Sequence, residues 1–468
     1  MHHPRRPCRG HQGPERQGKG LSAPGKRGWL VGLTAASVGL LYGYDLSSIA
    51  GALLFLRPEF DLTDGQQQLV ATMVVIGQIA GALGAGVLAN AIGRQKSMVL
   101  IAVGYALFAV LGATSVSMPM LLIARLLIGV AIGVSVVVVP VYVAESAPAA
   151  VRGSLLASYQ LATISGLIIG YTTGYLLAGS QSWRLMLGLA AVPATLLLPA
   201  LLRMPDTARW YLLKGRAADA RRALLRVEPA EAVDGALAEI AAEVAEDHSG
   251  GGILAMLRPP YLRATLFVVA LNILVQITGI NAIVIYSPQL FGDMGFHGYF
   301  AKLALPAMAQ VGALVAVCVT LFLVDRAGRR PILLSGIAMM IVADAVLIGT
   351  NATGSPALAL GFVGVLLFLV GFSLGFGSLV WVFAGESFPS HLRSVGSSVM
   401  LTSNLTANAL VVGFSLTMRQ ALGISGMFAV FGFFAVVAFV VVYRFAPETK
   451  GRELEEIRHF WENGGRWP

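Results

Sequence analysis

Two ionisable residues lie inside long apolar stretches of the sequence, where charges are rare. Asp45 is in the first of these stretches and Arg125 is in the fourth. An unpaired charge at the centre of a bilayer costs at least ~2.5 to 3.5 kcal/mol, so the two side chains are natural partners. Pairing favours the carboxylate, whereas separation in apolar surroundings favours the neutral acid. The pair could therefore bind and release a proton; the alternative is a static ion pair that holds two helices together.

Other chemistries require side-chain clusters that this sequence does not contain. Every His lies in a predicted tail or loop, Cys8 is in a polar tail and Cys318 is in an apolar run. This usage indicates no disulfide framework and no metal site. No G-x-x-x-x-G-K-[ST] loop for ATP is present. We therefore predict a protein that is not an enzyme and that has no cofactor and no metal.

The elements that hold Asp45 and Arg125 must be membrane helices. Of 468 residues, 56% are hydrophobic and only 12% are charged, about half the ~25% of soluble domains. The mean hydropathy is +0.75, which leaves too little polar surface for a soluble chain of this length. The short alternating segments of a membrane β-barrel do not appear. The composition predicts an all-α membrane protein.

Twelve apolar stretches are long enough to cross a bilayer, which takes ~20 residues each. The predicted spans are 29–56, 66–92, 97–115, 119–143, 152–178, 184–204, 262–291, 302–324, 331–350, 356–385, 394–418 and 421–445. The corresponding regions are a disordered cytoplasmic tail at 1–28, a six-helix bundle at 29–204, a cytoplasmic linker with short amphipathic helices at 205–260, a second six-helix bundle at 261–445, and a cytoplasmic tail at 446–468.

The distribution of Lys and Arg predicts the orientation. The chain carries a net charge of +9 and a pI near 9.7, which in a membrane protein reflects basic cytoplasmic loops rather than nucleic-acid binding. Arg125 lies within a span, 28 of the 33 Lys and Arg residues fall on one side, and four fall on the other: Arg57, Arg184, Lys302 and Arg419. Both termini are therefore predicted to be cytoplasmic, in a multi-pass inner-membrane protein.

An internal repeat relates the two groups of six spans. Glu145–Arg152, after the fourth span, and Glu386–Arg393, after the tenth, share the pattern Glu-Ser-x-Pro-x-x-x-Arg. A weaker match joins Gly93-Arg94, between spans two and three, with Asp325 and Gly328-Arg329 between spans eight and nine. Two parallel repeats are typical of transporters that bind their substrate between the repeats.

Further strings carry a resemblance to a known family. They are Gly43-Tyr44-Asp45, Pro205-Asp206-Thr-Ala-Arg209-Trp210, Gln276-x-x-Gly279-Ile280-Asn281 and Pro447-Glu448-Thr449-Lys450-Gly451. With the two Glu-to-Arg strings, they make the chain resemble the sugar porter branch of the major facilitator superfamily, and its sugar–proton symporters, from the first span to Arg452. The resemblance implies twelve helices in two pseudo-repeated bundles that bind substrate in alternation from the two sides.

The resemblance also implies roles for the charged residues. Proton symporters of this family carry Asp opposite Arg at the positions of Asp45 and Arg125. Charges at the cytoplasmic helix ends form a gate that holds the outward-facing state, here Glu145, Arg152, Arg94, Asp325, Arg329, Glu386 and Arg393. The alternative for these gate residues is that they only direct membrane topology. Asn90 stands where the family usually has Asp, which predicts a weaker gate in the first half.

A sugar site follows from the same resemblance. Amides that donate and accept hydrogen bonds, and an aromatic ring, suit sugar hydroxyls and the C–H face. The matching positions are Gln160, Gln276, Asn281, Trp381 and Asn404, with Tyr42, Tyr286, Phe372 and Gly377 lining the same cavity. The alternative is that buried amides only hold helices together and that the other four are plain packing.

Several positions depart from the family pattern. Val275, Ala313 and Leu405 replace polar or aromatic sugar contacts, and Ser378 replaces a Pro in span ten. A lost hydrogen bond costs ~1 kcal/mol or more in recognition, so these departures do not predict an ordinary hexose site. A less hydroxylated or differently shaped polyol is the alternative substrate. Asp344, in span nine, is an ionisable residue that the family motifs do not explain. It is either a second proton site or a carboxyl that points to a polar groove or to headgroups.

The predicted function is import of a sugar or polyol by proton symport, in a monomer surrounded by lipid. A passive facilitator is the first alternative. A non-transporting nutrient sensor is the second, disfavoured because only about twenty residues follow the last span.

Overall fold

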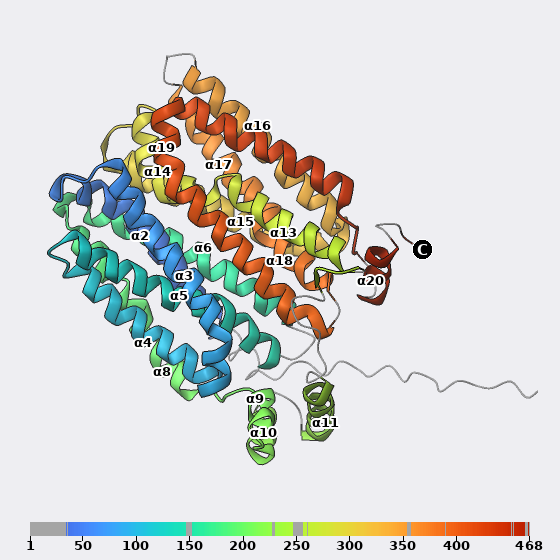
Figure 1. Ribbon diagram of the computed structural model, residues 1–468. Coiled ribbons are helices and arrows are strands. Elements are labelled where there is room, and N and C mark those ends of the chain that lie inside the picture. The colour runs from blue at the N-terminus through green and yellow to red at the C-terminus, as the bar shows by residue number, and fades with distance from the viewer. Residues whose placement is uncertain are drawn as a thin grey trace, which may run out of the picture.

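The computed structural model describes residues 34, 36–146, 152–226, 230–246, 256–259, 261–352, 357–388, 390–450, 452, 454–463 and 467, and the regular elements of these residues are helices (Figure 1). Long, roughly parallel rods make up the body of the molecule, and short helices cluster at one end of it.

The first half contains six spans. They are α2 (Gly39–Glu59), α3 (Asp64–Ile92), α4 (Arg94–Ala113), α5 (Met118–Ser146), α6 (Arg152–Leu177), and α7 (Trp183–Gly188) continued by α8 (Ala191–Arg203). Local signals set these ends. At the start of α3, Thr63 Oγ1 accepts from the Gln66 N–H, and Gln66 Oε1 accepts from the Thr63 N–H at 2.9 Å, which is a capping box.

Short helices follow the first half. They are α9 (Ala208–Leu213), α10 (Ala217–Leu224) and α11 (Ala230–Glu246). They lie beyond the last turns of the long helices, and α20 (Leu454–Glu462) lies near the same end (Figure 1). We call this the linker end of the molecule and the opposite one the distal end.

The second half contains helices that are interrupted more often. They are α13 (Leu262–Ile277) with α14 (Ile280–Asp293), the π-helical turn η3 (Phe300–Ala304) with α15 (Leu305–Ala327), α16 (Arg329–Ala352), α17 (Leu358–Leu374) with α18 (Phe376–Glu386), and α19 (Ser390–Phe445). The last of these has non-helical backbone at Gly423 (φ 71°, ψ 177°), which divides it into two helices.

The described residues contain eleven helical stretches long and apolar enough to span a membrane. The last, Gly396–Phe445, is 50 residues long and is divided at Gly423, so the predicted twelve membrane helices are confirmed. The predicted boundary between the last two spans was a few residues earlier than Gly423.

The two halves repeat the same packing. In the first half α2 packs on α6, α3 on α5, and α4 on α8; in the second, α13 packs on α19, α15 on α17, and α16 on α19. The turns before α4 and α16 have nearly identical backbones, at Gly93 (φ 100°, ψ 160°) and Gly328 (φ 95°, ψ 159°).

A carboxylate caps the helix that follows each of these turns. Asp206 Oδ1 accepts from the Arg94 N–H at 3.0 Å, and Glu448 accepts from the N–H groups of Arg329 and Arg330 at 3.1 Å. Anionic caps are favoured at a helix N-terminus. Because Asp206 and Glu448 belong to the matching Pro-Asp-Thr and Pro-Glu-Thr strings, the repeat extends from sequence to geometry.

Candidate functional site

Asp45 and Arg125 form a buried ion pair between α2 and α5. Arg125 Nη1 donates to Asp45 Oδ1 at 2.6 Å, and each residue is only 2% exposed. The other carboxylate oxygen, Oδ2, has no hydrogen-bond partner among the described residues. The pairing expected from the sequence is therefore present, and it uses only one of the two acceptor oxygens of Asp45.

Hydrogen bonds to backbone carbonyls fix the helix that carries Asp45. Tyr105 on α4 donates to the carbonyl of Leu41 at 2.9 Å, and Tyr44 donates to that of Met186 on α7 at 3.0 Å. These bonds join α2 to α4 and α7 within the turn that precedes Asp45.

The second half contains a continuous chain of buried amides. Asn281 donates to Gln276 Oε1 at 2.9 Å, and Gln276 donates to Asn404 Oδ1 at 3.0 Å. Asn404 in turn donates to Asn272 Oδ1 at 3.4 Å, and Asn272 donates to the carbonyl of Val268 at 2.9 Å. Three of the amides expected from the sequence are thus in contact with one another.

Asn272 is a member of this chain that the sequence analysis missed. It is fully buried on α13, four residues before Gln276, so one helical turn places the two amides on the same face. This four-residue spacing was the sequence signal that could have identified Asn272 as part of the amide chain.

A break in the seventh span brings Asn281 back to Gln276. The chain changes direction at Gly279 (φ 92°, ψ 10°), between the last turn of α13 and the first turn of α14. A Cβ at this position would lie 2.5 Å from the ring of Phe431, so both the backbone angle and the close approach require glycine.

The tenth span is also broken, at Gly375 between α17 and α18. Ser378 lies in the first turn of α18 and its hydroxyl donates to the carbonyl of Ser373 at 2.7 Å. The helix is therefore interrupted here without the Pro that Ser378 replaces. Beyond the break, Trp381 is 46% exposed.

The remaining expected ligands differ in their surroundings. Tyr286 is buried and donates to the carbonyl of Val412 on α19 at 3.1 Å, so its hydroxyl joins two helices. Tyr42 and Gln160 are half-buried on α2 and α6, and the half-buried Phe372 has its ring 6.2 Å from that of Phe376. Gly377 lies against the Phe372 ring.

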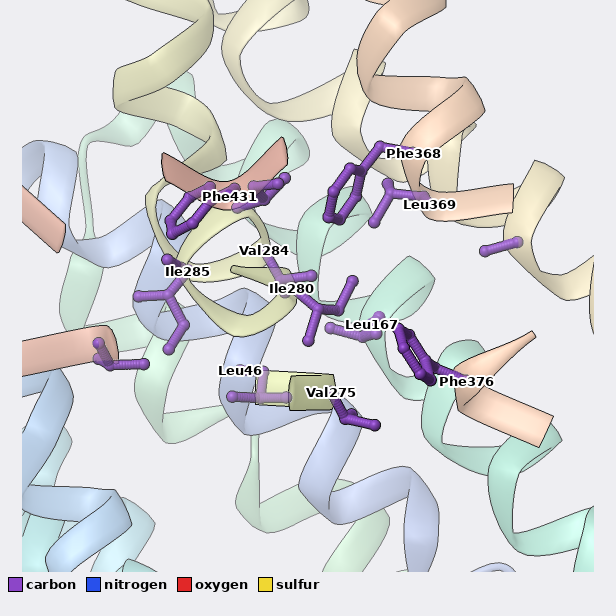
Figure 2. Close-up of a cluster of buried hydrophobic side chains, with 14 of the residues drawn as sticks. Leu46, Leu167, Val275, Ile280, Val284, Ile285, Phe368, Leu369, Phe376 and Phe431 are labelled. Carbon is purple, nitrogen blue, oxygen red and sulfur yellow. The ribbon is translucent and has the colours of Figure 1, made fainter. Parts of the chain in front are cut away.

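An apolar cluster joins the halves near the amide chain. Figure 2 shows the side chains of Leu46 and Leu167 from the first half facing Val275, Ile280 and Phe376 from the second. Val275, Ala313 and Leu405, which replace the family's polar contacts, are each 5% exposed or less. These three departures from the family pattern are therefore apolar and buried.

Polar contacts join the two halves at the distal end. Arg419 of α19 pairs with Asp64 of α3 at 3.2 Å, and it also pairs with Asp293. Gln289 donates to Gln67 at 2.8 Å. Asp64 also pairs with Arg57 at 3.3 Å, so it is the centre of this group of contacts.

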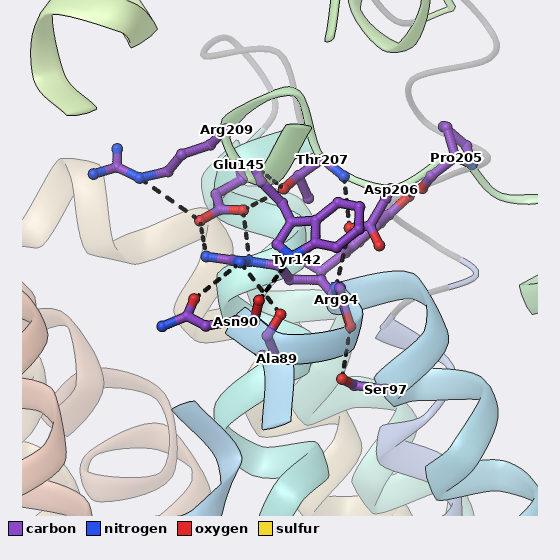
Figure 3. A network of polar contacts seen from close by, with 12 residues as sticks. Ala89, Asn90, Arg94, Ser97, Tyr142, Glu145, Pro205, Asp206, Thr207 and Arg209 are labelled. Atoms are coloured by element: carbon purple, nitrogen blue, oxygen red, sulfur yellow. Dashed lines mark hydrogen bonds and ion pairs between the residues drawn. The ribbon is translucent and has the colours of Figure 1, made fainter. Parts of the chain in front are cut away.

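The linker end carries a second polar network, shown in Figure 3. Arg94 pairs with Glu145 at 3.1 Å and donates to Asn90 Oδ1 at 3.1 Å, while Thr207 donates to Glu145 at 2.6 Å. Asn90 therefore still accepts a hydrogen bond from Arg94 in place of the family's Asp. Burial raises the pKa of Asp206. The backbone N–H groups that donate to its carboxylate lower the pKa, but by less.

Only part of the expected gate can be placed. Arg94 and Glu145 are in contact. The backbone N–H of Arg329 donates to Glu448, which caps α16. The side chains of four other expected gate residues lie outside the described part of the structure: Arg152, Asp325, Glu386 and Arg393.

Comparison with known proteins gives concordant matches. The sequence profile of the family described as "Sugar (and other) transporter" matches residues 31–461. The galactose-proton symporter of Escherichia coli (strain K12) is 32% identical over 434 residues, covering 92% of this chain and 93% of that protein. The glucose transporter GlcP of Staphylococcus epidermidis is 34% identical over 436 residues, covering 92% and 96%. The proton:xylose symporter XylE bound to 6-bromo-6-deoxy-D-glucose is similar in structure, with a TM-score of 0.80 and 25% identity, covering 93% of this chain and 99% of that one.

Proposed function

The chain belongs to the sugar transporter family of the major facilitator superfamily, and from this premise we propose that it imports a sugar or related polyol together with protons, by alternating access. As a member of that family it is a transporter and not an enzyme. The proposal adds the direction, the coupling to protons, and the residues that perform each step.

The single observation that carries the coupling is the buried Asp45–Arg125 pair. Arg125 stabilises the Asp45 carboxylate while the two are 2.6 Å apart. Because both residues lie in the first half, the pair separates when α2 shifts against α5 during the conformational cycle. The carboxylate then loses its counter-charge in a site that excludes water, and proton binding becomes favourable. The free Oδ2 oxygen is the atom that receives the proton. Proton binding and the conformational change are thus coupled through one ion pair.

The amide chain is the proposed substrate site. Gln276, Asn281 and Asn404 hold each other in fixed orientations, so their remaining donors and acceptors are ready for substrate hydroxyls. Val275 and Leu405, which precede Gln276 and follow Asn404 in the sequence, are apolar. This combination favours a substrate with a hydroxylated edge and an apolar face, and Trp381 and Gln160 are proposed to complete the site.

The contacts between the halves support a conformational assignment. We place the linker end in the cytoplasm, where most Lys and Arg residues then lie, so that the distal end faces outward. Arg419–Asp64 and Gln289–Gln67 join the halves at that distal end, which corresponds to a state closed to the outside. The Arg94–Glu145 pair is intact in this packing and lies within the first half, so we propose that it contributes to the cytoplasmic gate without by itself holding the outward-facing state.

Replacement of Asp45 tests the coupling. In proteoliposomes with an imposed pH gradient, the parent protein should accumulate a sugar or polyol from a panel above its equilibrium concentration. Asp45→Asn should abolish this accumulation, because the amide cannot take up the transported proton. Counterflow in the absence of a pH gradient should persist in the variant, which would show that it is folded and binds substrate.

Asp61→Asn, at an exposed acid of a distal loop, is the matched control and should accumulate substrate like the parent. Uphill accumulation by Asp45→Asn equal to that of the parent would exclude the coupling role. If the parent equilibrates the substrate but never accumulates it, the protein is a passive facilitator.

A further inference from the structure

A second buried acid lies in the half of the molecule that does not contain Asp45. Asp344 is in the bilayer-spanning part of α16, is 1% exposed, and faces α19. Its Cβ lies 3.1 Å from where a Cβ on Gly432 would be. Neither carboxyl oxygen has a hydrogen-bond partner among the described residues. The side chain therefore does not reach the headgroups, which was one of the expectations for it.

The helices packed against Asp344 offer no counter-charge at its level. α17 contains no titratable residue, and Gly432 is about 17 Å along its helix from Tyr443 and Arg444. On α16 itself, Arg330 lies fourteen residues earlier, about 21 Å away along the axis. Glu386 is the last residue of α18, and Asp325 and Arg326 are near the end of α15, at the linker end.

Two other groups lie closer to Asp344 along the helix axes, but they do not pair with it. Cys318 on α15 lies about 9 Å nearer the linker end than Asp344, on an antiparallel neighbour. Arg419, before the kink in α19, is engaged by Asp64 and Asp293. The described part of the chain thus gives Asp344 neither a cation nor a hydrogen-bond donor.

An ionised carboxylate without a partner is far more costly in such a site than the neutral acid. We propose that Asp344 is a second proton-binding site, occupied in this packing, whose bound proton keeps the contact between α16 and α19 neutral. It differs from Asp45 in having no cation to compete with the proton. Its proton therefore supports the fold of the second half and is not transported with substrate.

A linkage with pH follows. In the unfolded chain an Asp is ionised above about pH 4, whereas the folded protein retains the proton, so unfolding releases it. The stabilisation is fully present at low pH and is lost as the pH rises. Over the range in which only the folded state is protonated, the unfolding constant increases about tenfold per pH unit from this one site.

The test compares thermal unfolding of purified parent, Asp344→Asn and Asp61→Asn from acidic to alkaline pH. Asp344→Asn should lose a component of the pH dependence and become more stable than the parent at alkaline pH, because its amide is always neutral. Asp61→Asn, an exposed acid, should retain the parent's slope. A slope in Asp344→Asn equal to that of the parent would overturn the proposal.

Infrared spectroscopy gives a readout that does not depend on stability. The Asp45→Asn protein should show the carbonyl stretch of a protonated carboxylic acid at neutral pH, and this band should be absent from the Asp45→Asn, Asp344→Asn double variant. A carboxylate band alone would contradict the assignment. Proton-driven accumulation should survive in Asp344→Asn, so failure of this proposal and failure of the Asp45 coupling are separable.

Discussion

At the scale of single residues, an acid in a bilayer-spanning helix needs either a cation or a proton. Asp45 has the guanidinium of Arg125 at 2.6 Å, whereas Asp344 has no partner in the described part of the chain. The same residue type thus supports two roles, a charge that exchanges with a proton during transport and a neutral group that stays in place. The amide chain shows a related division, since Asn272 accepts from Asn404 and donates to a backbone carbonyl, and is proposed to act by holding Asn404.

Replacement of Asn272 tests this positioning role. Asn272→Leu removes the oxygen that accepts from Asn404, so Asn404 and Gln276 are no longer fixed. A net hydrogen bond of ~1 kcal/mol corresponds to about a fivefold loss of apparent substrate affinity, with little change in maximal rate. The measurement is KM and maximal rate of uptake for a substrate identified in the panel.

Asn408→Leu is the control, because it lies on α19 one turn after Asn404, is also buried, and takes no part in the chain. Its KM should stay near that of the parent. An unchanged KM in Asn272→Leu would assign Asn272 to helix packing alone.

At the scale of elements, the second half is built from interrupted helices. The breaks at Gly279 and Gly375 end one helix and begin another within a single span, next to the amide chain and Trp381. Interrupted membrane helices leave backbone groups without intrahelical partners, which is tolerated only where protein or a water-filled cavity satisfies them. The breaks therefore place the adaptable backbone where substrate is proposed to bind.

Gly279→Ala should destabilise the protein strongly. The new Cβ would be 2.5 Å from Phe431, and a φ of 92° adds roughly 1–2 kcal/mol of strain for a residue with a side chain. Thermal unfolding in detergent should show a clear decrease in Tm. Adding Phe431→Ala should recover only part of the loss, because the backbone strain remains.

Gly349→Ala on α16 is the control, since its Cβ would meet open space. Ala is favoured over Gly in a helix by up to ~1 kcal/mol, so the Tm should be equal or higher. A Tm for Gly279→Ala as high as that of the control would show that the break does not depend on glycine.

At the scale of the whole molecule, two halves with the same internal packing meet along α3 with α19 and α6 with α15. The polar contacts around Asp64 lie at the distal end of this interface, and Tyr171 of α6 shares a hydrogen bond of 2.9 Å with Ser287 of α14. Contacts that exist only when the distal ends touch stabilise that state relative to the opposite one.

Arg419→Gln should therefore shift the population toward a state open at the distal end. A partly buried pair worth ~1 kcal/mol corresponds to about a fivefold increase in the open population. The measurement is the rate at which a thiol reagent labels Ser287→Cys, in a chain with Cys8 and Cys318 replaced by Ser. Ser287 is 4% exposed in the closed interface, so labelling reports opening.

Arg184→Gln is the matched control, because Arg184 pairs with Glu59 at 2.7 Å within the first half and does not join the halves. It should label at the rate of the parent. Equal labelling rates in both variants would remove the Arg419 pair from the gate.

The sequence by itself determined the class of fold, because a bilayer imposes on each segment a requirement that its own composition must meet. The twelve apolar stretches follow from this local rule, and so does the need of two charges that lipid excludes for a partner. The repeated strings indicated separately that the two halves share one architecture. What only the tertiary structure decided are contacts set by register and crossing angle between distant segments. The tertiary structure joined Asn272 to Asn404 and Asp206 to the first turn of α4, used the Tyr286 hydroxyl to join helices, and left Asp344 without a partner among the described residues. Hydrophobicity defines which segments enter the membrane, but it does not specify which faces of which helices meet, so the neighbours of a particular polar side chain are fixed only by packing.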